Sequence, residues 1–143
     1  MITRETDYAI RALLCLARRA PGEVISASVM AEEMEIPYRF LRRIVLKLSE
    51  EGFVTTLRGK YGGMRLAKAP ATITLLEVMR AADPDAITLN LCLANSANCS
   101  RSASCVVHDE LAEIQAQFMQ RLSAVTLATL LQREQTAGQQ RIA

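Results

Sequence analysis

The sequence lacks any hydrophobic run long enough to cross a membrane, and this absence narrows the classes of protein that it can encode. No stretch approaches the roughly 18 uninterrupted apolar residues that a spanning helix needs. The opening residues, Met-Ile-Thr-Arg-Glu-Thr-Asp, do not have the form of a secretory signal peptide. We therefore expect a cytoplasmic protein with no membrane partner.

The chain also lacks the motifs on which many enzymes depend. It shows no internal repeat, no glycine motif that would hold a phosphate, and no nucleophile with an apparent base. We therefore expect a binding protein and not an enzyme. Its 143 residues, half of them hydrophobic, suffice for one domain, or for one small domain with an appended oligomerisation element.

Positive charge is concentrated in the middle of the chain. The net charge is only +2, but residues 37–68 contain eight basic and two acidic residues, a local balance of +6. Residues 69–143 contain five basic and seven acidic residues, a balance of −2. A basic middle on an otherwise acidic chain indicates a surface for a polyanion such as DNA.

Hydrophobic periodicity predicts helices in the first part of the chain. The predicted spans are Thr3 or Thr6 to Arg19, Ser26 or Ser28 to Met34, and Tyr38 to about Glu51. In the last of these, the apolar face consists of Phe40, Leu41, Ile44, Val45 and Leu48, and the basic residues fall largely on the other face. Two short helices joined by a tight turn, the second one basic on its outer face, predict a helix-turn-helix.

After Gly52 the pattern changes to that of a two-stranded hairpin. Residues 53–57 and 64–67 are predicted strands, and the glycine-rich run 58–63 is the predicted turn. A hairpin directly after a helix-turn-helix is typical of a wing. Arg58 and Lys60 lie at its tip, next to glycines that allow the backbone to approach a ligand closely.

A compact helix over residues 74–82 is followed, after the cysteine segment, by a long striped helix. Ser104 can cap the long helix, and its apolar residues recur at 107, 111, 114, 118, 122 and 125. One narrow apolar stripe usually packs against another helix, so we expect a symmetric partner; packing on the chain's own domain is the alternative. Residues 124–134 are expected to add a short helix, and residues 135–143 a disordered tail.

Residues 91–108 contain three of the four cysteines and the only histidine. Six residues separate Cys92 from Cys99, five separate Cys99 from Cys105, and His108 follows Cys105 at an i, i+3 interval. Cys15 lies in an apolar helix and is a predicted core thiol, whereas Cys99 lies in a polar run. Ordering such a run costs roughly 1–2 kcal/mol per residue, which metal coordination would offset. In a reducing compartment this pattern predicts a metal or redox site; zinc fits less well because its usual short C-x2-4-C spacing is absent.

With these residues in view, the chain resembles the Rrf-type family of bacterial winged-helix transcription regulators over about residues 1–134. The likeness rests on the order and spacing of its markers. These are Thr6-Asp7-Tyr8-Ala9-Ile10-Arg11, the segment from Ile36-Pro37 to Gly52-Phe53-Val54, Arg58-Gly59 with Gly62-Gly63 and Arg65-Leu66, and the spaced cysteines.

The resemblance implies a homodimer, crossed along the helix after the cysteine segment, that binds a roughly palindromic operator in double-stranded DNA. It also implies an iron–sulfur cluster held by Cys92, Cys99 and Cys105. Two family patterns compete for the fourth ligand: His108 for a 2Fe-2S cluster, or an acid from the first helix of the partner subunit, here Asp7, for a 4Fe-4S cluster. In this chain six residues separate Cys92 from Cys99, whereas five separate the corresponding cysteines in family members of both patterns. The resemblance therefore does not fix the cluster type. An exposed helix histidine and a first-turn acid are the plainer interpretations of these two residues.

The expected fold is mainly α-helical with a small β-wing, a winged helix-turn-helix followed by a long dimerisation helix. The expected domains are residues 1–83 for the winged helix-turn-helix with its supporting helix, 84–108 for the ligand loop, 104–134 for the dimerisation helix and a short C-terminal helix, and 135–143 for the tail. The predicted DNA contacts are Tyr38, Arg39, Arg42, Arg43, Lys47, Arg58, Lys60 and Tyr61.

The expected function is a transcription regulator, a repressor, whose cluster state controls operator binding in response to iron, nitric oxide or redox stress. A cluster-free regulator of the same family, which responds to a metabolite or a protein partner, is the alternative.

Overall fold

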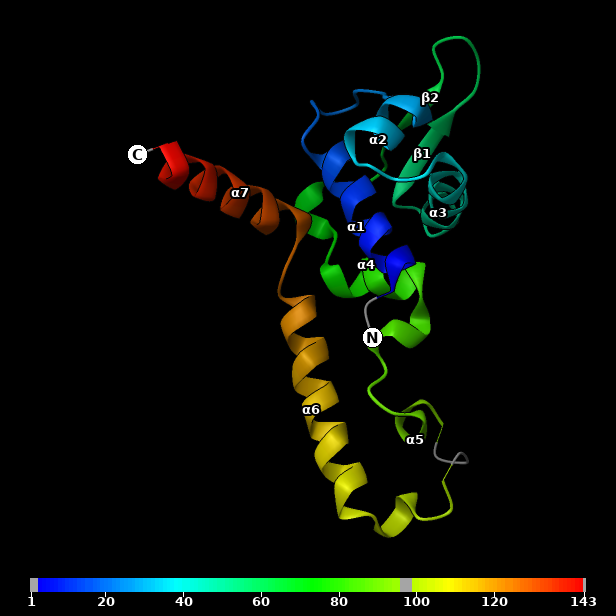
Figure 1. Cartoon of the computed structure of the whole chain (residues 1–143), viewed down its shortest axis with the longest axis vertical. Helices are drawn as coiled ribbons and strands as arrows, with labels where there is room; N and C mark the ends of the chain where they lie inside the picture. The colour runs from blue at the N-terminus through cyan, green and yellow to red at the C-terminus, as the bar shows by residue number, and fades with distance from the viewer. Residues whose placement is uncertain (1–2, 96–98, 143) are drawn as a thin grey trace.

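The protein folds into a helical head from which two longer helices extend (Figure 1). Its structure, a computed structural model, describes residues 3–95 and 99–142. The elements are α1 (Arg4–Ala17), α2 (Ala27–Glu33), α3 (Tyr38–Glu50), β1 (Val54–Leu57), β2 (Gly63–Leu66), α4 (Leu75–Ala82), α5 (Leu91–Ala94), α6 (Val106–Ser123) and α7 (Leu127–Ile142), with short 3-10 turns at Pro70–Thr72, Pro84–Ile87 and Ser102–Ser104. The predicted mainly helical class with a small β-wing is confirmed. Within the described residues, no helix combines the length and apolar character that crossing a membrane requires.

The core of the head lies where α1, α3 and α4 pack together. Leu13, Leu41 and Val78, one from each helix, have no exposed surface. α1 begins at the predicted cap, because the Thr3 hydroxyl oxygen accepts a hydrogen bond from the Thr6 backbone N–H at 3.4 Å. Cys15 lies in this core with 1% of its surface exposed, as predicted.

The turn between α2 and α3 is closed by backbone hydrogen bonds. Ile36 N–H donates to the Ala31 carbonyl at 3.0 Å and Glu35 N–H to Glu32 at 3.3 Å, the pattern of a Schellman motif. Glu35 therefore takes the left-handed conformation, with φ 53°, that glycine usually supplies. Pro37 is the N-cap of α3, so this helix begins at Tyr38, as predicted. These contacts fix the predicted helix-turn-helix.

β1 and β2 form the predicted wing, paired antiparallel from Val54 opposite Leu66 to Leu57 opposite Gly63. A short bridge from Ile25 to Met64 ties the wing to the segment before α2. The backbone of Gly63 lies so close to the Ile25 carbonyl oxygen that a Cβ at this position would collide with it. The wing is therefore anchored at its base, while its tip extends beyond the head (Figure 1).

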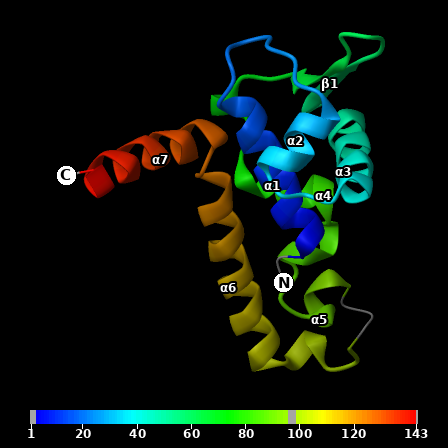
Figure 2. The same cartoon turned by 45° about the horizontal axis from the view of Figure 1, so that its top comes forward.

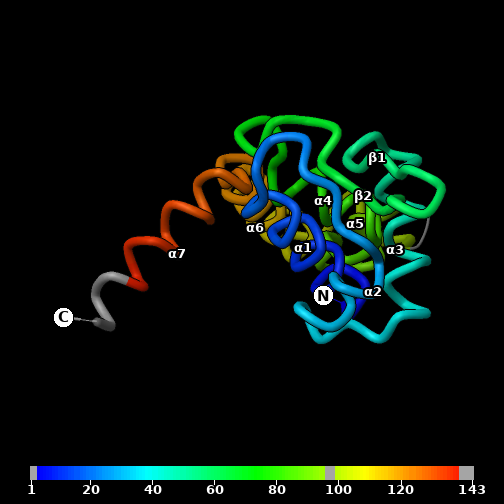
Figure 3. Tube along the Cα trace, turned by 90° about the horizontal axis from the view of Figure 1, so that it is seen from above, coloured from blue at the N-terminus to red at the C-terminus, as the bar shows by residue number. Residues whose placement is uncertain are grey.

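α6 leaves the head along a small apolar contact with α4. Leu76, Met79 and Ile87 pack there against Phe118, Met119 and Leu122. The opposite end of α6 lies close to α5, below the N-terminal end of α1 (Figure 2). α7 then turns away from α6 and projects from the head, as the view from above shows (Figure 3).

Several local expectations need correction. The N-cap of α6 is Cys105, whose side chain makes no capping hydrogen bond. Ser104, expected in this role, does not cap the helix. Phe40, expected on the buried face of α3, is 46% exposed and lies beside Tyr8.

The tail expected to be disordered from residue 135 is helical as far as Ile142. Glutamine, alanine and arginine are favourable helix formers and are common in this segment, with Gly138 as the poor one. Arg18, the C-cap of α1, also pairs with Glu134 in the middle of α7 at 2.6 Å, which ties this helix to the head.

Candidate nucleic-acid interface and ligand segment

A basic groove lies between α3 and the wing. The residues that line it are Arg39, Arg42, Arg43, Val45, Leu46, Thr56 and Arg58. Four of these side chains are cationic, and none of those that the structure describes there is acidic. α3 supplies three of the arginines because residues 39, 42 and 43 recur at helical spacing, and β1 leads directly to the fourth. This groove can bind the phosphates of a nucleic acid, since guanidinium groups make charge-assisted hydrogen bonds to phosphate oxygens.

The remaining predicted DNA contacts lie around this groove or outside it. Tyr38 begins α3 and is 47% exposed. Lys60 and Tyr61 lie at the wing tip, where the Lys60 ammonium is 5.7 Å from the centre of the Tyr61 ring, and Tyr61 is 87% exposed. Both wing residues are therefore available to a partner that contacts the tip.

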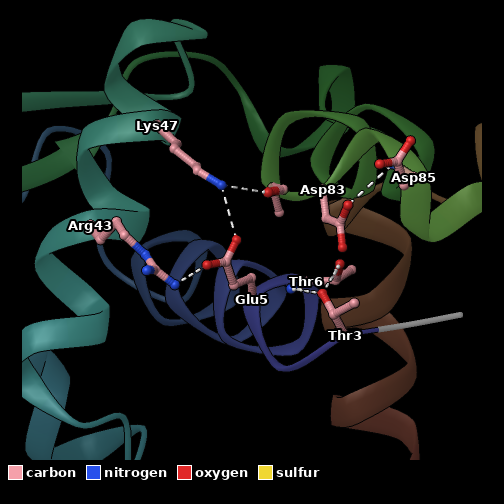
Figure 4. A network of polar contacts seen from close by, with 8 residues as sticks. Thr3, Glu5, Thr6, Arg43, Lys47, Asp83 and Asp85 are labelled. Atoms are coloured by element: carbon pink, nitrogen blue, oxygen red, sulfur yellow. Dashed lines mark hydrogen bonds and ion pairs between the residues drawn. The ribbon is translucent and has the colours of Figure 1, made fainter.

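Lys47 does not line the groove. Its ammonium donates to a carboxylate oxygen of Glu5 at 2.9 Å and to the Ala82 carbonyl at 3.0 Å, so it connects α3 to both α1 and α4 (Figure 4). Arg43 forms an ion pair with the other oxygen of the same Glu5 carboxylate. The helical pattern placed Lys47 on the outer face of α3; the structure leaves its side chain 40% exposed but directs its ammonium toward α1 and α4.

Glu5 is a residue that the sequence did not single out. It lies in the first turn of α1, where an acid is explained by the helix dipole alone. Its contact with Arg43 joins positions 38 residues apart, which no local pattern reveals. Thr3 and Thr6 lie nearby on the same helix end and form a separate hydrogen bond with each other, at 3.2 Å (Figure 4).

The cysteine segment brings two of its predicted ligands together. Cys92 lies on α5 and His108 in the first turn of α6, and the His108 Nδ1 is 3.4 Å from the Cys92 Sγ. Cys99 and Cys105 are partly buried, and all three thiols are free. Part of the predicted ligand loop, residues 96–98, lies outside the described residues.

An iron–sulfur cluster is the group that the sequence implies for these residues, and their chemistry fits it. Cysteine thiolates and a histidine nitrogen are the ligands of such clusters. Within residues 3–95 and 99–142, however, no three histidine, cysteine or acidic side chains converge on one point. The structure therefore places the Cys92–His108 pair, and it does not bring Cys99 and Cys105 to it.

Asp7, the other predicted fourth ligand, is paired within its own helix. Its carboxylate lies 2.8 Å from Arg11 at an i, i+4 spacing, and both side chains are 44% exposed. Such an exposed pair is weak, so a competing ligand can displace it at small cost.

Cys15 differs from the other cysteines in its surroundings. Burial raises the pKa of its thiol, a hydrogen bond from Arg19 acts in the opposite direction, and Glu33 adds to the rise. Its Sγ donates to the Glu33 carboxylate at 3.5 Å. A neutral buried thiol is a poor metal ligand, which makes Cys15 a matched control for the other three.

The stripe on α6 is divided between two environments. Phe118 and Leu122 pack on the chain's own α4, so part of the stripe serves the domain itself. Nearer the cysteine segment, Val107 and Ile114 are 59% and 45% exposed. Leu91 on the neighbouring α5 is 74% exposed. This end of α6 therefore presents an apolar surface.

Comparison with known proteins finds a family model and solved structures that match most of the chain. The model of a family described as Rrf2, iron-dependent transcriptional regulator, matches residues 2–133. Among solved structures, IscR of T. potens matches with a TM-score of 0.72 and 20% identity, over 96% of this chain and 90% of that chain. CymR, the global cysteine regulator of B. subtilis, matches with a TM-score of 0.72 and 22% identity, over 91% and 95%. The oxidized form of CymR from Staphylococcus aureus matches with a TM-score of 0.71 and 20% identity, over 91% and 94%. At these identities the structures establish the shared fold.

Proposed function

The chain belongs to the Rrf2 family of transcriptional regulators, and from this premise we propose that it is a homodimeric, iron–sulfur-dependent regulator that binds operator DNA through the groove beside α3. The observation that carries the DNA-binding function is the set of four arginines along that groove. The Cys92–His108 contact supports the cofactor.

DNA binding follows from the way the helix-turn-helix presents α3. An α-helix fits the major groove of B-DNA, and arginine can bind guanine edges there with two hydrogen bonds. Arg39 and Arg42 project from the first half of α3, and Arg58 faces them from the wing. The exposed Lys60 and Tyr61 at the wing tip then reach the neighbouring backbone or the minor groove.

A second copy of the chain is the partner proposed for α6. The exposed apolar residues of α6 lie at the end nearest the cysteine segment, where Val107 and Ile114 keep 59% and 45% of their surface exposed. A two-fold axis there would pair two heads and set half-sites about one or more helical turns apart, on the order of 34 Å per turn.

For the cofactor, we propose Cys92, Cys99, Cys105 and His108 as ligands. When bound, an iron–sulfur cluster supplies a centre that reacts to redox change, nitric oxide and iron loss. The chain's own part is to connect the ligand segment to the DNA-binding surface. His108 belongs to α6, α6 packs on α4, and the last residue of α4, Ala82, accepts the hydrogen bond from Lys47 of α3. A rearrangement of the ligand segment has this contiguous route to α3.

Anaerobic purification followed by native mass spectrometry tests the cofactor and the dimer together. We expect a dimer that carries iron and sulfide in stoichiometric amounts. Cys99→Ala should lose both and stay a folded dimer, whereas Cys15→Ala, the matched control, should retain them. Neither iron nor sulfide in the wild-type protein would remove the cofactor and leave the cluster-free regulator as the function.

The fourth ligand is tested by a pair of variants. Since His108 already contacts Cys92, His108→Ala should change the visible absorption of the bound cluster, and Asp7→Asn should leave it unchanged. The opposite result would assign the ligand to Asp7 of the partner subunit.

The DNA-binding function is tested by selection from random duplexes, with the same anaerobic protein. We expect enrichment of a roughly palindromic site. Failure to enrich any sequence, together with no binding at low salt, would contradict the function.

A further inference from the structure

Glu5 connects the beginning of α1 to the recognition helix α3. One of its carboxylate oxygens pairs with Arg43, and the other accepts from Lys47 at 2.9 Å (Figure 4). The Glu5 side chain is 27% exposed, less than either of its partners. One acid therefore faces two cations of a helix that otherwise presents its positive charge to DNA.

The two cations differ in how firmly they are held. Lys47 has a second acceptor, the Ala82 carbonyl at 3.0 Å, so it is held from both α1 and α4. Arg43 is 55% exposed, its guanidinium lies 5.5 Å from the centre of the Phe40 ring, and it also lines the groove. Arg43 is thus within reach of both Glu5 and a ligand in the groove.

We propose that Glu5 sets the DNA affinity of this protein, because its carboxylate competes with a DNA phosphate for the Arg43 guanidinium. The inference rests on the proposed DNA-binding function and adds an internal acid that opposes it. Lys47 makes the exchange inexpensive: when Arg43 turns toward a phosphate, the Glu5 carboxylate keeps Lys47 as its counter-ion and is not left unpaired.

The size of the effect follows from the exposure of the pair. Breaking a partly exposed ion pair changes an equilibrium by about two- to five-fold. Glu5→Gln keeps an oxygen that can accept from Lys47 and removes the charge that holds Arg43. We therefore expect Glu5→Gln to bind its selected duplex about two- to five-fold more tightly per chain at low salt. Glu5→Asp should also bind the duplex more tightly than wild type, because its side chain is one methylene shorter and holds Arg43 less well.

A double-mutant cycle separates this competition from a general effect of charge. Removing any acid near DNA strengthens binding, but only a competition for Arg43 disappears when Arg43 is absent. The cycle compares wild type, Glu5→Gln, Arg43→Ala and the double variant, each as the full-length dimer and each with its thermal midpoint recorded. Glu50→Gln is the matched control, because it removes one exposed acid from α3 itself.

The expected result is a gain from Glu5→Gln in the wild-type background, none in the Arg43→Ala background, and a smaller gain from Glu50→Gln. Weaker or unchanged binding by Glu5→Gln would overturn the proposal, and so would a gain that persists without Arg43. Both results leave the proposed function intact as long as the wild type binds. If the wild-type protein binds no duplex, the proposed function fails and this inference fails with it.

Discussion

Removal of two arginines from opposite sides of the α3 groove should flatten the salt dependence of DNA binding. Arg42 comes from α3 and Arg58 from the end of β1, and both line the groove. Each phosphate contact contributes about 0.9 to the slope of log affinity against log salt. With Arg42 and Arg58 both counted as phosphate contacts, the variant Arg42→Ala/Arg58→Ala loses two contacts per chain and four per dimer, so the slope should fall by about 3.6.

Fluorescence anisotropy on the selected duplex measures this slope directly. Between 50 mM and 200 mM salt, a difference of about 3.6 in slope changes the affinity ratio of wild type to variant on the order of 100-fold. Arg121→Ala/Arg133→Ala is the control, because it removes the same charge from α6 and α7, outside the groove. An unchanged slope in the groove variant, or an equal change in the control, would refute the groove as the DNA interface.

Three further predictions concern the scaffold. Thr74→Ala should cost about 1 kcal/mol in urea unfolding at neutral pH by removing half of the α4 capping box. Hydrogen bonds from the Thr74 backbone and hydroxyl hold the pKa of Glu77 below its usual value. The stability from Glu77 is therefore present above its unfolded pKa and is lost as pH falls through its folded pKa, so the cost of Thr74→Ala should shrink in acid. Arg18→Ala should speed hydrogen exchange in α7 while changing global stability by less than about 1 kcal/mol, because the ion pair that it breaks is exposed; equal exchange would show that the pair does not hold α7. Gly63→Ala should cost about 1–3 kcal/mol, since its Cβ would collide with the Ile25 carbonyl; an unchanged melting temperature would contradict the rigid wing base.

Sequence reasoning located the elements whose signals are local. The Thr3 cap, the end of α3 at Gly52 and the hairpin after it depend on residues a few positions apart. Gly52 has φ 73°, and α3 ends in a Schellman motif like the one that ends α2. In it, the Gly52 N–H donates to the Ser49 carbonyl and the Phe53 N–H to the Leu48 carbonyl. Periodicity alone also predicted the arginines on α3 that line the groove.

Features that depend on long-range packing could not be predicted in this way. Lys47 and Arg42 look equivalent as basic residues on one helix, yet only Lys47 meets an acid and a carbonyl from two other helices. The helical part of α7 beyond Glu134 has no apolar stripe, so its composition alone suggested a tail. For Lys47 the deciding contacts come from residues distant in the sequence, and α7 is tied to the head by Arg18, 116 residues away from Glu134.

The ligand segment lies between these extremes. Composition identified Cys92 and His108 as members of one set, and they meet at 3.4 Å although 16 residues separate them. Their meeting depends on α5 folding back onto the first turn of α6. The i, i+3 spacing pointed to Cys105 and His108, so it did not predict the contact between His108 and Cys92. Spacing also could not choose between His108 and the partner subunit's Asp7 as the fourth ligand, since Asp7 would come from another chain.

The central claim, that the state of the cluster controls operator binding, is tested most directly by one comparison. The affinity for the selected duplex is measured on a single anaerobic preparation, before and after removal of iron and sulfide, with the dimer mass confirmed in both states. A coupling of typical size predicts affinities that differ by about 5- to 150-fold. Equal affinities of two intact dimers would contradict the claim.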